Sequence, residues 1–160
     1  MSNLVRYIMR NVGDVTSARR SSDYLKSKGI SISHVKLEDY LGYMEEAFLV
    51  DRVQRMDSKT KDYLSTSDKF YATDLGIRNT VVPYRAEETD GILENIVYNE
   101  LRLRCSEVAV CMTGSRVIDF IAAYRSGLFG FRCKIADELR QLSESGTVQE
   151  VDVVVAVSAR

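Results

Sequence analysis

Two neighbouring stretches constrain the fold of this chain more than any other, residues 91–101 and residues 117–122. The first predicts an amphipathic helix, because its apolar residues recur at three- and four-residue spacing: Ile92, Leu93, Ile96, Val97 and Leu101. The second is a short run rich in β-branched residues after a turn at 113–115, so it predicts a buried strand. Asp119 lies inside that strand. A carboxylate there needs a charged partner or a cation, which makes Asp119 the most informative residue of the chain.

The composition leaves the number of domains open. The chain has 160 residues, 45% of them hydrophobic, which is enough for one ordinary domain or two small ones. Residues 1–64 carry 11 Lys and Arg against 9 Asp and Glu, and residues 65–160 carry 11 against 14. Only the first part has a positive excess, and that excess is too small to decide for nucleic acid.

The cysteines and the single histidine give no metal-binding pattern. Cys105, Cys111 and Cys133 are irregularly spaced and His34 lies far from them, which argues against a zinc site or a disulfide framework. This usage fits a reducing cytoplasm. No apolar run approaches about 18 residues, so we expect neither a membrane partner nor a signal peptide.

Residues 1–80 predict a winged helix-turn-helix domain. Helices are expected over 4–12, from Thr16 or Ser17 to Gly29, and from the capping residue Ser33 to Glu46. Strands at 48–55 and 61–64, joined by a turn at 57–60, would form the wing. A strand at 69–72 and a short helix over 73–77 complete this part.

Residues 81–90 contain the only proline and an acidic cluster, which predicts a linker. Residues 91–160 then predict a helix followed by strands near 108–111, 117–122 and 128–135. A polar helical stretch from Ala136 and an apolar strand at 151–157 follow. The fold class expected for the whole chain is α+β.

This order of elements resembles the carboxyl-terminal region of prokaryotic AAA-type ATPases, a winged helix followed by a restriction-endonuclease-like domain of unknown function. The resemblance covers residues 4–123. It is carried by segments 25–29 with Ser33, 40–41, 46–50, 64–65, 69–79, 91–101 and 118–121. It implies a small, incomplete restriction-endonuclease-like α/β unit over 91–160, with the tail 124–160 outside the match. No Gly-x-x-x-x-Gly-Lys-Ser/Thr loop occurs, so we expect the chain to lack the ATPase module.

The resemblance also implies where nuclease residues would lie. Such nucleases use an acid on the first helix, an Asp on a strand and a Glu-x-Lys on the next strand, with Mg²⁺ held by the carboxylates. Glu94, Asp119 and Lys134 take the catalytic positions, but Arg132 stands where a metal-binding Glu belongs. We therefore expect an inactive remnant without a metal, unless Asp137 or Glu138 substitutes for the missing acid.

The winged helix suggests a nucleic-acid surface as one interpretation. Its candidate phosphate contacts are Lys36, Arg52, Arg55, Lys59 and Lys61. The alternative is a protein-interaction module, which is favoured by the acids on the third predicted helix and next to it: Glu38, Asp39, Glu45 and Glu46. Four aromatic residues are either a base-stacking platform or core residues, the second being the commoner role: Tyr63, Phe70, Tyr71 and Tyr84. His34 is expected at the surface, and the cysteines are expected to be small buried residues.

From these observations we expect a non-catalytic accessory or regulatory region that acts with an ATPase module and binds nucleic acid or protein. No cofactor is expected. The alternatives are a Mg²⁺-dependent nuclease with a degenerate site, a free-standing winged-helix DNA-binding regulator, and a decayed gene product. The tail beyond Ala123 is either diverged or read in an altered frame. The oligomeric state is left open.

Overall fold

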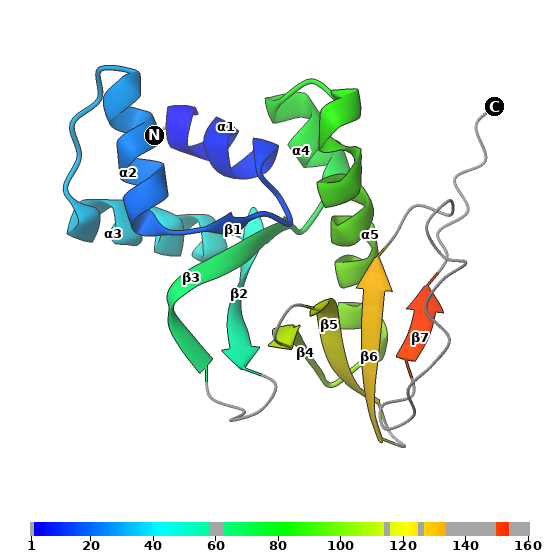
Figure 1. The fold of residues 1–160 in the computed structure, drawn as a ribbon. Helices are drawn as coiled ribbons and strands as arrows, with labels where there is room; N and C mark the ends of the chain where they lie inside the picture. The colour runs from blue at the N-terminus through cyan, green and yellow to red at the C-terminus, as the bar shows by residue number, and fades with distance from the viewer. Residues whose placement is uncertain (1, 58–62, 114–115, 125–126, 134–149, 154–160) are drawn as a thin grey trace.

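The structure of this chain is a computed structural model that describes residues 2–57, 63–113, 116–124, 127–133 and 150–153. Side chains are described for the same residues except 56–57, 64–67, 86, 111–113, 116–119, 121, 123–124, 127–133 and 150–153. The described residues form a mixed α+β fold (Figure 1). The helices are α1 Ser2–Arg10, α2 Ala18–Ser27, α3 His34–Glu46, α4 Leu75–Val81, the 3-10 helix η1 Ala86–Glu88 and α5 Thr89–Arg104. The strands are β1 Val15–Thr16, β2 Val50–Asp57, β3 Tyr63–Ala72, β4 Glu107–Thr113, β5 Arg116–Tyr124, β6 Gly127–Cys133 and β7 Glu150–Val153.

The described strands belong to one sheet, in the order β1-β3-β2-β4-β5-β6-β7. Neighbouring strands are antiparallel except for β2 with β4 and β6 with β7. The β2–β4 pair is short, since it joins only 55–57 of β2 to 110–112 of β4. Strands from the predicted winged helix and from the predicted 91–160 unit therefore lie in the same sheet, and the division into two domains stays a prediction.

The β2–β3 pair has a hydrophobic core on each of its two faces, because side chains alternate along a strand. Val50, Phe70 and Ala72 face the first core, together with apolar side chains of α1, α2 and α3. Val53 and Tyr71 face the second core, which α5, β4 and β5 complete. Figure 1 shows β2 and β3 with α1, α2 and α3 to one side and α5 to the other.

Three of the helices begin at a residue with a short polar side chain, which accepts a hydrogen bond from a main-chain amide of the first helical turn. Ser17 accepts a hydrogen bond from the Arg20 amide, and Ser33 accepts one from the Lys36 amide. Each bond satisfies an amide that has no partner inside its helix. Of the two predicted alternatives Thr16 and Ser17, Ser17 is the cap, the predicted cap Ser33 is confirmed, and Asp74 caps α4 in the same way.

Two glycines let the segment after α1 lie directly against the start of α5. Gly13 has a φ of +79°, and a Cβ placed on it would lie 3.2 Å from the Gly91 Cα. A Cβ on Gly91 would overlap the Val12 carbonyl oxygen. The Gly13 amide also donates to the Phe70 carbonyl at 3.0 Å. This close approach holds the chain after α1 against both β3 and α5.

A buried arginine connects α1, α4 and η1. Arg78 is fully buried, and its Nε donates to the Met9 carbonyl at 3.1 Å. Its guanidinium also pairs with Glu88, whose carboxylate lies 3.5 Å from the Arg10 Nε. A buried charge is tolerated when it is paired and hydrogen-bonded in this way.

The predicted elements agree with the structure best where the sequence pattern is local. The helix predicted over 91–101 is part of α5, and the strands predicted at 108–111 and 117–122 are parts of β4 and β5. The described part of the strand predicted at 61–64 and the strand predicted at 69–72 belong to one continuous strand, β3. The predicted turn at 57–60 lies largely outside the described residues, as does the stretch from Ala136.

Two details of the prediction are wrong. Phe48 was expected to open a strand, but it follows α3 with a φ of +53° and β2 begins only at Val50. Ile96 was expected in the buried stripe of α5, but it is exposed, while Asn95 and Tyr98 are buried. Polar contacts of these two side chains with β2 and β3, described below, set the orientation of α5.

None of the described helices is long and apolar enough to cross a membrane.

Candidate functional site

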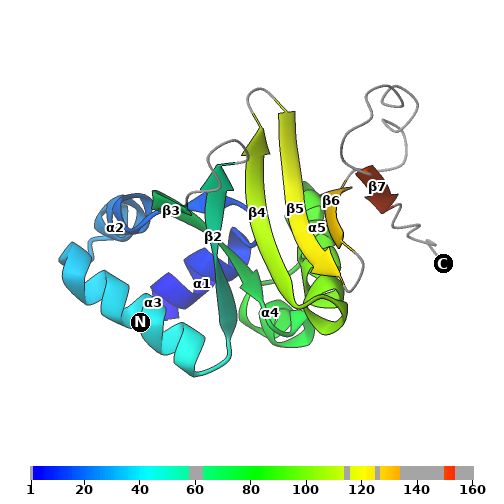
Figure 2. The ribbon, with the colours of Figure 1, turned by 90° about the horizontal axis from the view of Figure 1, so that it is seen from below.

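An open groove lies where β2 and β4 diverge. The two strands pair only near their carboxyl-terminal ends and separate toward their amino-terminal ends (Figure 2). The groove has a volume of about 700 Å³. One wall is β2 over 50–54, the other is 105–109, and Tyr98 and Arg102 of α5 lie between them, with Glu45, Phe48 and Tyr63 also lining the groove.

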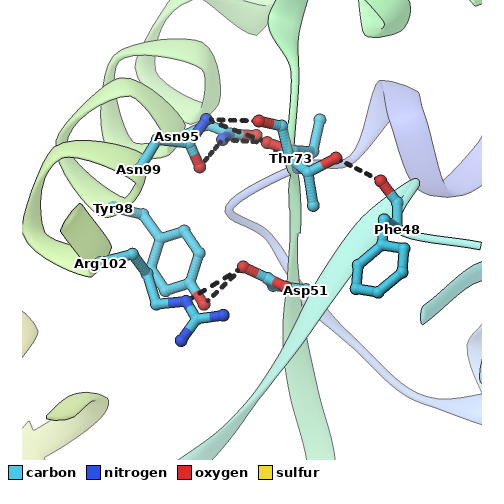
Figure 3. A network of polar contacts seen from close by, with 8 residues as sticks. Phe48, Asp51, Thr73, Asn95, Tyr98, Asn99 and Arg102 are labelled. Atoms are coloured by element: carbon cyan, nitrogen blue, oxygen red, sulfur yellow. Dashed lines mark hydrogen bonds and ion pairs between the residues drawn. The ribbon is translucent and has the colours of Figure 1, made fainter. Parts of the chain in front are cut away.

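A tyrosine, an acid and an arginine meet in the groove (Figure 3). The Tyr98 hydroxyl donates to Asp51 Oδ2 at 3.1 Å, and Arg102 Nε lies 3.3 Å from the same oxygen. Burial raises the pKa of the Tyr98 phenol well above its usual range, and the Asp51 carboxylate adds to this effect. Tyr98 therefore stays protonated at neutral pH, where it can donate a hydrogen bond but cannot act as a base.

The end of β3 is covered by two asparagines of α5. Asn95 accepts from the Ala72 amide at 2.7 Å and donates to the Ala72 carbonyl at 2.9 Å. Asn99 donates to the Ala72 carbonyl at 3.1 Å and to the Thr73 carbonyl at 3.4 Å (Figure 3). Asn95 is fully buried. Its side-chain amide thus takes the place of a neighbouring strand at Ala72.

Phe48 has a strained backbone at the edge of the groove. Its amide donates to the Glu45 carbonyl at 2.9 Å, and the Leu49 amide donates to the Met44 carbonyl at 3.0 Å. These two bonds form the Schellman motif that ends α3, in which the residue at Phe48 is usually glycine. The Phe48 side chain is 79% exposed. It gains little from burial to offset its left-handed backbone conformation.

The predicted phosphate contact Arg52 is held by acids. Its Nε lies 2.6 Å from Asp68 Oδ2, and its Nη1 lies 2.8 Å from Glu38 Oε2. Burial lowers the pKa of the Arg52 guanidinium, but the bonds to Asp68 and Glu38 outweigh it, and the pKa is raised. The Arg52 guanidinium also lies over the Phe70 ring, 5.8 Å from the centroid. Arg52 is therefore already satisfied inside the molecule.

The other predicted nucleic-acid contacts do not form one described cluster. Lys36 is exposed on α3, with its ammonium 5.9 Å from the centroid of the Tyr40 ring. Arg55 is half-buried in β2. Lys59 and Lys61 lie outside the described residues.

The predicted nuclease acid Glu94 lies in a buried polar cluster. Lys69 Nζ is 2.7 Å from Glu94 Oε1, and the Tyr71 hydroxyl donates to the same oxygen at 2.5 Å. The backbone of Asp119 lies in β5 and that of Arg132 in β6, but their side chains are outside the described set, as is all of Lys134. Asp137 and Glu138 are outside it too. Among the described residues, no group of three or more His, Cys, Asp or Glu could hold a metal ion.

The remaining candidate residues divide between core and surface. His34 is exposed, as predicted. Phe70 and Tyr71 are core residues, whereas Tyr63 and Tyr84 are 63% and 60% exposed. Cys105 is half-buried and free, and the side chains of Cys111 and Cys133 lie outside the described residues.

Sequence reasoning missed Asp51, Asn95 and Tyr98. Asp51 was counted as an ordinary strand residue, and the other two were counted as polar positions of an amphipathic helix. Their contacts join residues 23 and 47 positions apart, as in Asn95 with Ala72 and Tyr98 with Asp51. No local pattern marks such pairs. A polar residue between apolar ones on the buried face of α5 was the only available indication.

Comparison with known proteins places the chain in a family. Residues 1–88, more than half of the sequence, match the family described as "Domain of unknown function (DUF8612)". The chain belongs to this family. Over 122 residues it is also 31% identical to an uncharacterized protein of Haemophilus influenzae, a match that covers 76% of this chain and 30% of that protein. The matched part thus spans less than a third of the relative. No solved structure matches the chain.

The DUF8612 match ends between the two walls of the groove. The β2 wall, Phe48 and the acids around Arg52 lie within residues 1–88, whereas Tyr98, Arg102 and the 105–109 wall lie beyond them. The groove therefore needs the DUF8612 region and the helix and strand that follow it.

Proposed function

We propose that this DUF8612 chain is a non-catalytic accessory or regulatory region of a protein related to prokaryotic AAA-type ATPases, and that it binds another polypeptide rather than DNA. The order of α1–α3, the β2–β3 strands and α5 with β4–β6 supports the relation, since it follows the order of elements in the carboxyl-terminal region of those ATPases. The 30% coverage of the Haemophilus protein is consistent with a function exercised inside a larger chain.

The contacts of Arg52 carry this proposal. A winged helix that binds DNA presents its cations to phosphate, but Arg52 lies between Glu38 and Asp68. Burial also raises the pKa of the nearby Glu45 carboxyl, with Arg52 opposing this effect. Phosphate would have to approach three carboxylates and separate two ion pairs. A polypeptide with no dense negative charge meets no such barrier.

The contacts of Glu94 argue in the same direction against the nuclease alternative. A Mg²⁺ ion at this site would need the Glu94 carboxylate as a ligand, but Oε1 already accepts from the Lys69 ammonium and the Tyr71 hydroxyl. A divalent cation bound to Glu94 would lie close to the Lys69 ammonium, and the two positive charges would repel each other. The described donors around Glu94 therefore do not fit a metal ion.

A DNA titration tests the first part of the proposal. The 160-residue chain is titrated against a labelled DNA duplex at low salt, with Arg52→Ala as the variant. We expect no binding by either protein. Binding that weakens steeply with salt and disappears in Arg52→Ala would contradict the proposal, because both features are expected of phosphate contacts.

A plasmid-cleavage assay tests the second part. Plasmid DNA is incubated with the protein and Mg²⁺ or Mn²⁺, and Asp119→Ala serves as the control for contaminating nuclease. No cleavage is expected. Cleavage by the wild type that the Asp119→Ala variant lacks would make the chain an enzyme.

A further inference from the structure

We propose that the groove between β2 and β4 binds an extended polypeptide segment rich in Lys or Arg, which adds to the open edge of β2 as a further strand. This inference rests on the proposed polypeptide-binding function and names the chemistry of the partner. Strand addition combines main-chain hydrogen bonds, which give affinity, with side-chain contacts, which select the sequence.

Three hydrogen bonds of β3 indicate which main-chain groups of β2 face the groove. Ala72 gives its main-chain groups to Asn95, and the Phe70 carbonyl accepts from Gly13, so neither residue uses these groups toward β2. Their partners in the antiparallel register are Val50 and Arg52. In such pairs both residues direct their amide and carbonyl groups away from each other. The main-chain groups of Val50 and Arg52 therefore point toward the groove.

No other strand covers this edge in the described part of the chain. β4 pairs with β2 only from Arg55 onward. Among the described residues, no main-chain hydrogen bond outside the helices and strand pairs reaches Val50 or Arg52. Both residues line the groove. An unpaired strand edge is a template for another strand, and its amides and carbonyls favour a partner that supplies both donors and acceptors.

The charges that line the groove select the sign of the partner. Arg102 is paired with Asp51, and Arg52 is paired with two acids. Glu45 and Glu107 also line the groove, and neither has a cation within 4.0 Å in the described residues. The charge left over is negative. Lys or Arg side chains of the bound segment would meet these two carboxylates.

Phe48 supplies an apolar contact at the edge of the groove. It is 79% exposed and keeps a backbone conformation that glycine would adopt with less strain. Fold stability therefore favours glycine at this position. The Phe48 ring can contribute to binding if an apolar side chain of the bound segment packs on it. Aromatic residues are frequent hot spots at protein interfaces.

The experiment measures fluorescence anisotropy of labelled hexapeptides with the full 160-residue chain. The probes are a capped Lys-Val-Lys-Val-Lys-Val peptide, the same peptide N-methylated at every peptide nitrogen, and the corresponding Glu-Val peptide. We expect binding of the first, with affinity at least about tenfold lower for the other two. The N-methylated peptide has the same charge but cannot donate main-chain hydrogen bonds, so it separates strand addition from general charge attraction.

Variants place the site on the protein. Phe48→Ala is expected to weaken binding of the basic peptide about tenfold, and Glu45→Gln with Glu107→Gln about fivefold. Leu103→Ala is the matched control, because Leu103 is 83% exposed and does not line the groove. It should leave the affinity unchanged.

Three outcomes would overturn the inference. They are no binding of the basic peptide, equal binding of the N-methylated or acidic peptide, and unchanged binding by the Phe48 and glutamate variants. If the DNA titration is also negative, the proposed function stands and only this partner is wrong. If DNA binds and depends on Arg52, the proposed function itself fails.

Discussion

The outer edge of β3 and the groove edge of β2 belong to the same pair of strands, yet their main-chain groups have opposite environments. At the β3 edge, Ala72 is bonded by Asn95, Phe70 is bonded by Gly13, and the register with β1 covers positions 68 and 69. At the β2 edge, Val50 and Arg52 face an open groove. A side chain such as Asn95 can therefore cover a strand edge in this fold, but none does so at the described edge of β2. In the described part of the chain, the β3 edge is closed by the fold, whereas Val50 and Arg52 of β2 are left for the partner that we propose.

The largest effect is expected from opening the closed edge. Asn95→Ala removes the partner of the buried Ala72 amide and one partner of its carbonyl, and each unsatisfied group costs about 1–3 kcal/mol. We expect the free energy of unfolding to fall by about 3 kcal/mol in urea denaturation followed by circular dichroism. Asn99→Ala should cost less, because Asn95 still bonds Ala72. A loss below about 1 kcal/mol in Asn95→Ala would mean that this edge is not closed by the side chain.

The next largest effect is expected at the contact between Gly13 and Gly91, which keeps the Gly13 amide close to the Phe70 carbonyl. A Cβ at Gly91 would overlap the Val12 carbonyl, so we expect Gly91→Ala to lower the free energy of unfolding by about 2 kcal/mol. Gly42→Ala is the control, because Gly42 lies in α3 with nothing within 4 Å of the added Cβ. It should raise stability by up to about 1 kcal/mol, since alanine favours helices over glycine. Similar effects of the two changes would contradict the close approach.

At the open edge, a substitution should stabilise the fold. Phe48→Gly removes the strain of a left-handed bulky residue, and we expect a gain of about 1 kcal/mol in the free energy of unfolding. Phe48→Ala retains the positive φ with a Cβ, so it should gain much less. Because the peptide is expected to bind Phe48→Gly weakly, stability and binding should change in opposite directions. A destabilised Phe48→Gly protein would show that the ring is needed by the fold.

The smallest effect is expected at Glu45. Burial raises the pKa of its carboxyl in the folded state, so ionisation of Glu45 lowers stability as the pH rises through that pKa. Glu45→Gln should therefore be more stable than the wild type at neutral pH, by less than Phe48→Gly gains. The difference should vanish as the pH falls below the usual range for Glu. Thermal unfolding between acidic and neutral pH measures it, and a difference that grows on acidification would have the wrong sign.

Local patterns made much of the fold predictable, and long-range contacts limited the rest. The caps Ser17 and Ser33 and the extent of α5 depend on neighbours within a few residues, so sequence reasoning located them. The prediction of a strand at Phe48 was wrong because the apolar residues 48–50 indicate a strand, whereas the way α3 ends sets the backbone conformation of Phe48. The coverage of Ala72 by Asn95 depends on a tertiary contact that periodicity cannot report.

The candidate site was predicted less well for the same reason. Arg52 was named as a phosphate contact from its charge and its place in the predicted wing, but its acids come from α3 and from β3. Glu94 was named as the acid of an inactive nuclease remnant, which stays a prediction, and its partners Lys69 and Tyr71 were not foreseen. The acidic residues of α3 were the sequence feature that favoured a protein-interaction module over a nucleic-acid surface.

The buried Arg78 has a consequence for how the protein can be divided into fragments. Arg78 belongs to α4, but the carboxylate that balances its charge belongs to Glu88. A fragment that stops at residue 80 would keep the guanidinium in the core beside Met9 and lose its counter-charge, at an expected cost of about 3–5 kcal/mol. A fragment that extends past Glu88 would retain the pair. Residue 88 is also where the DUF8612 match ends, so a fragment that stops at residue 80 should be less stable than one that stops at residue 88.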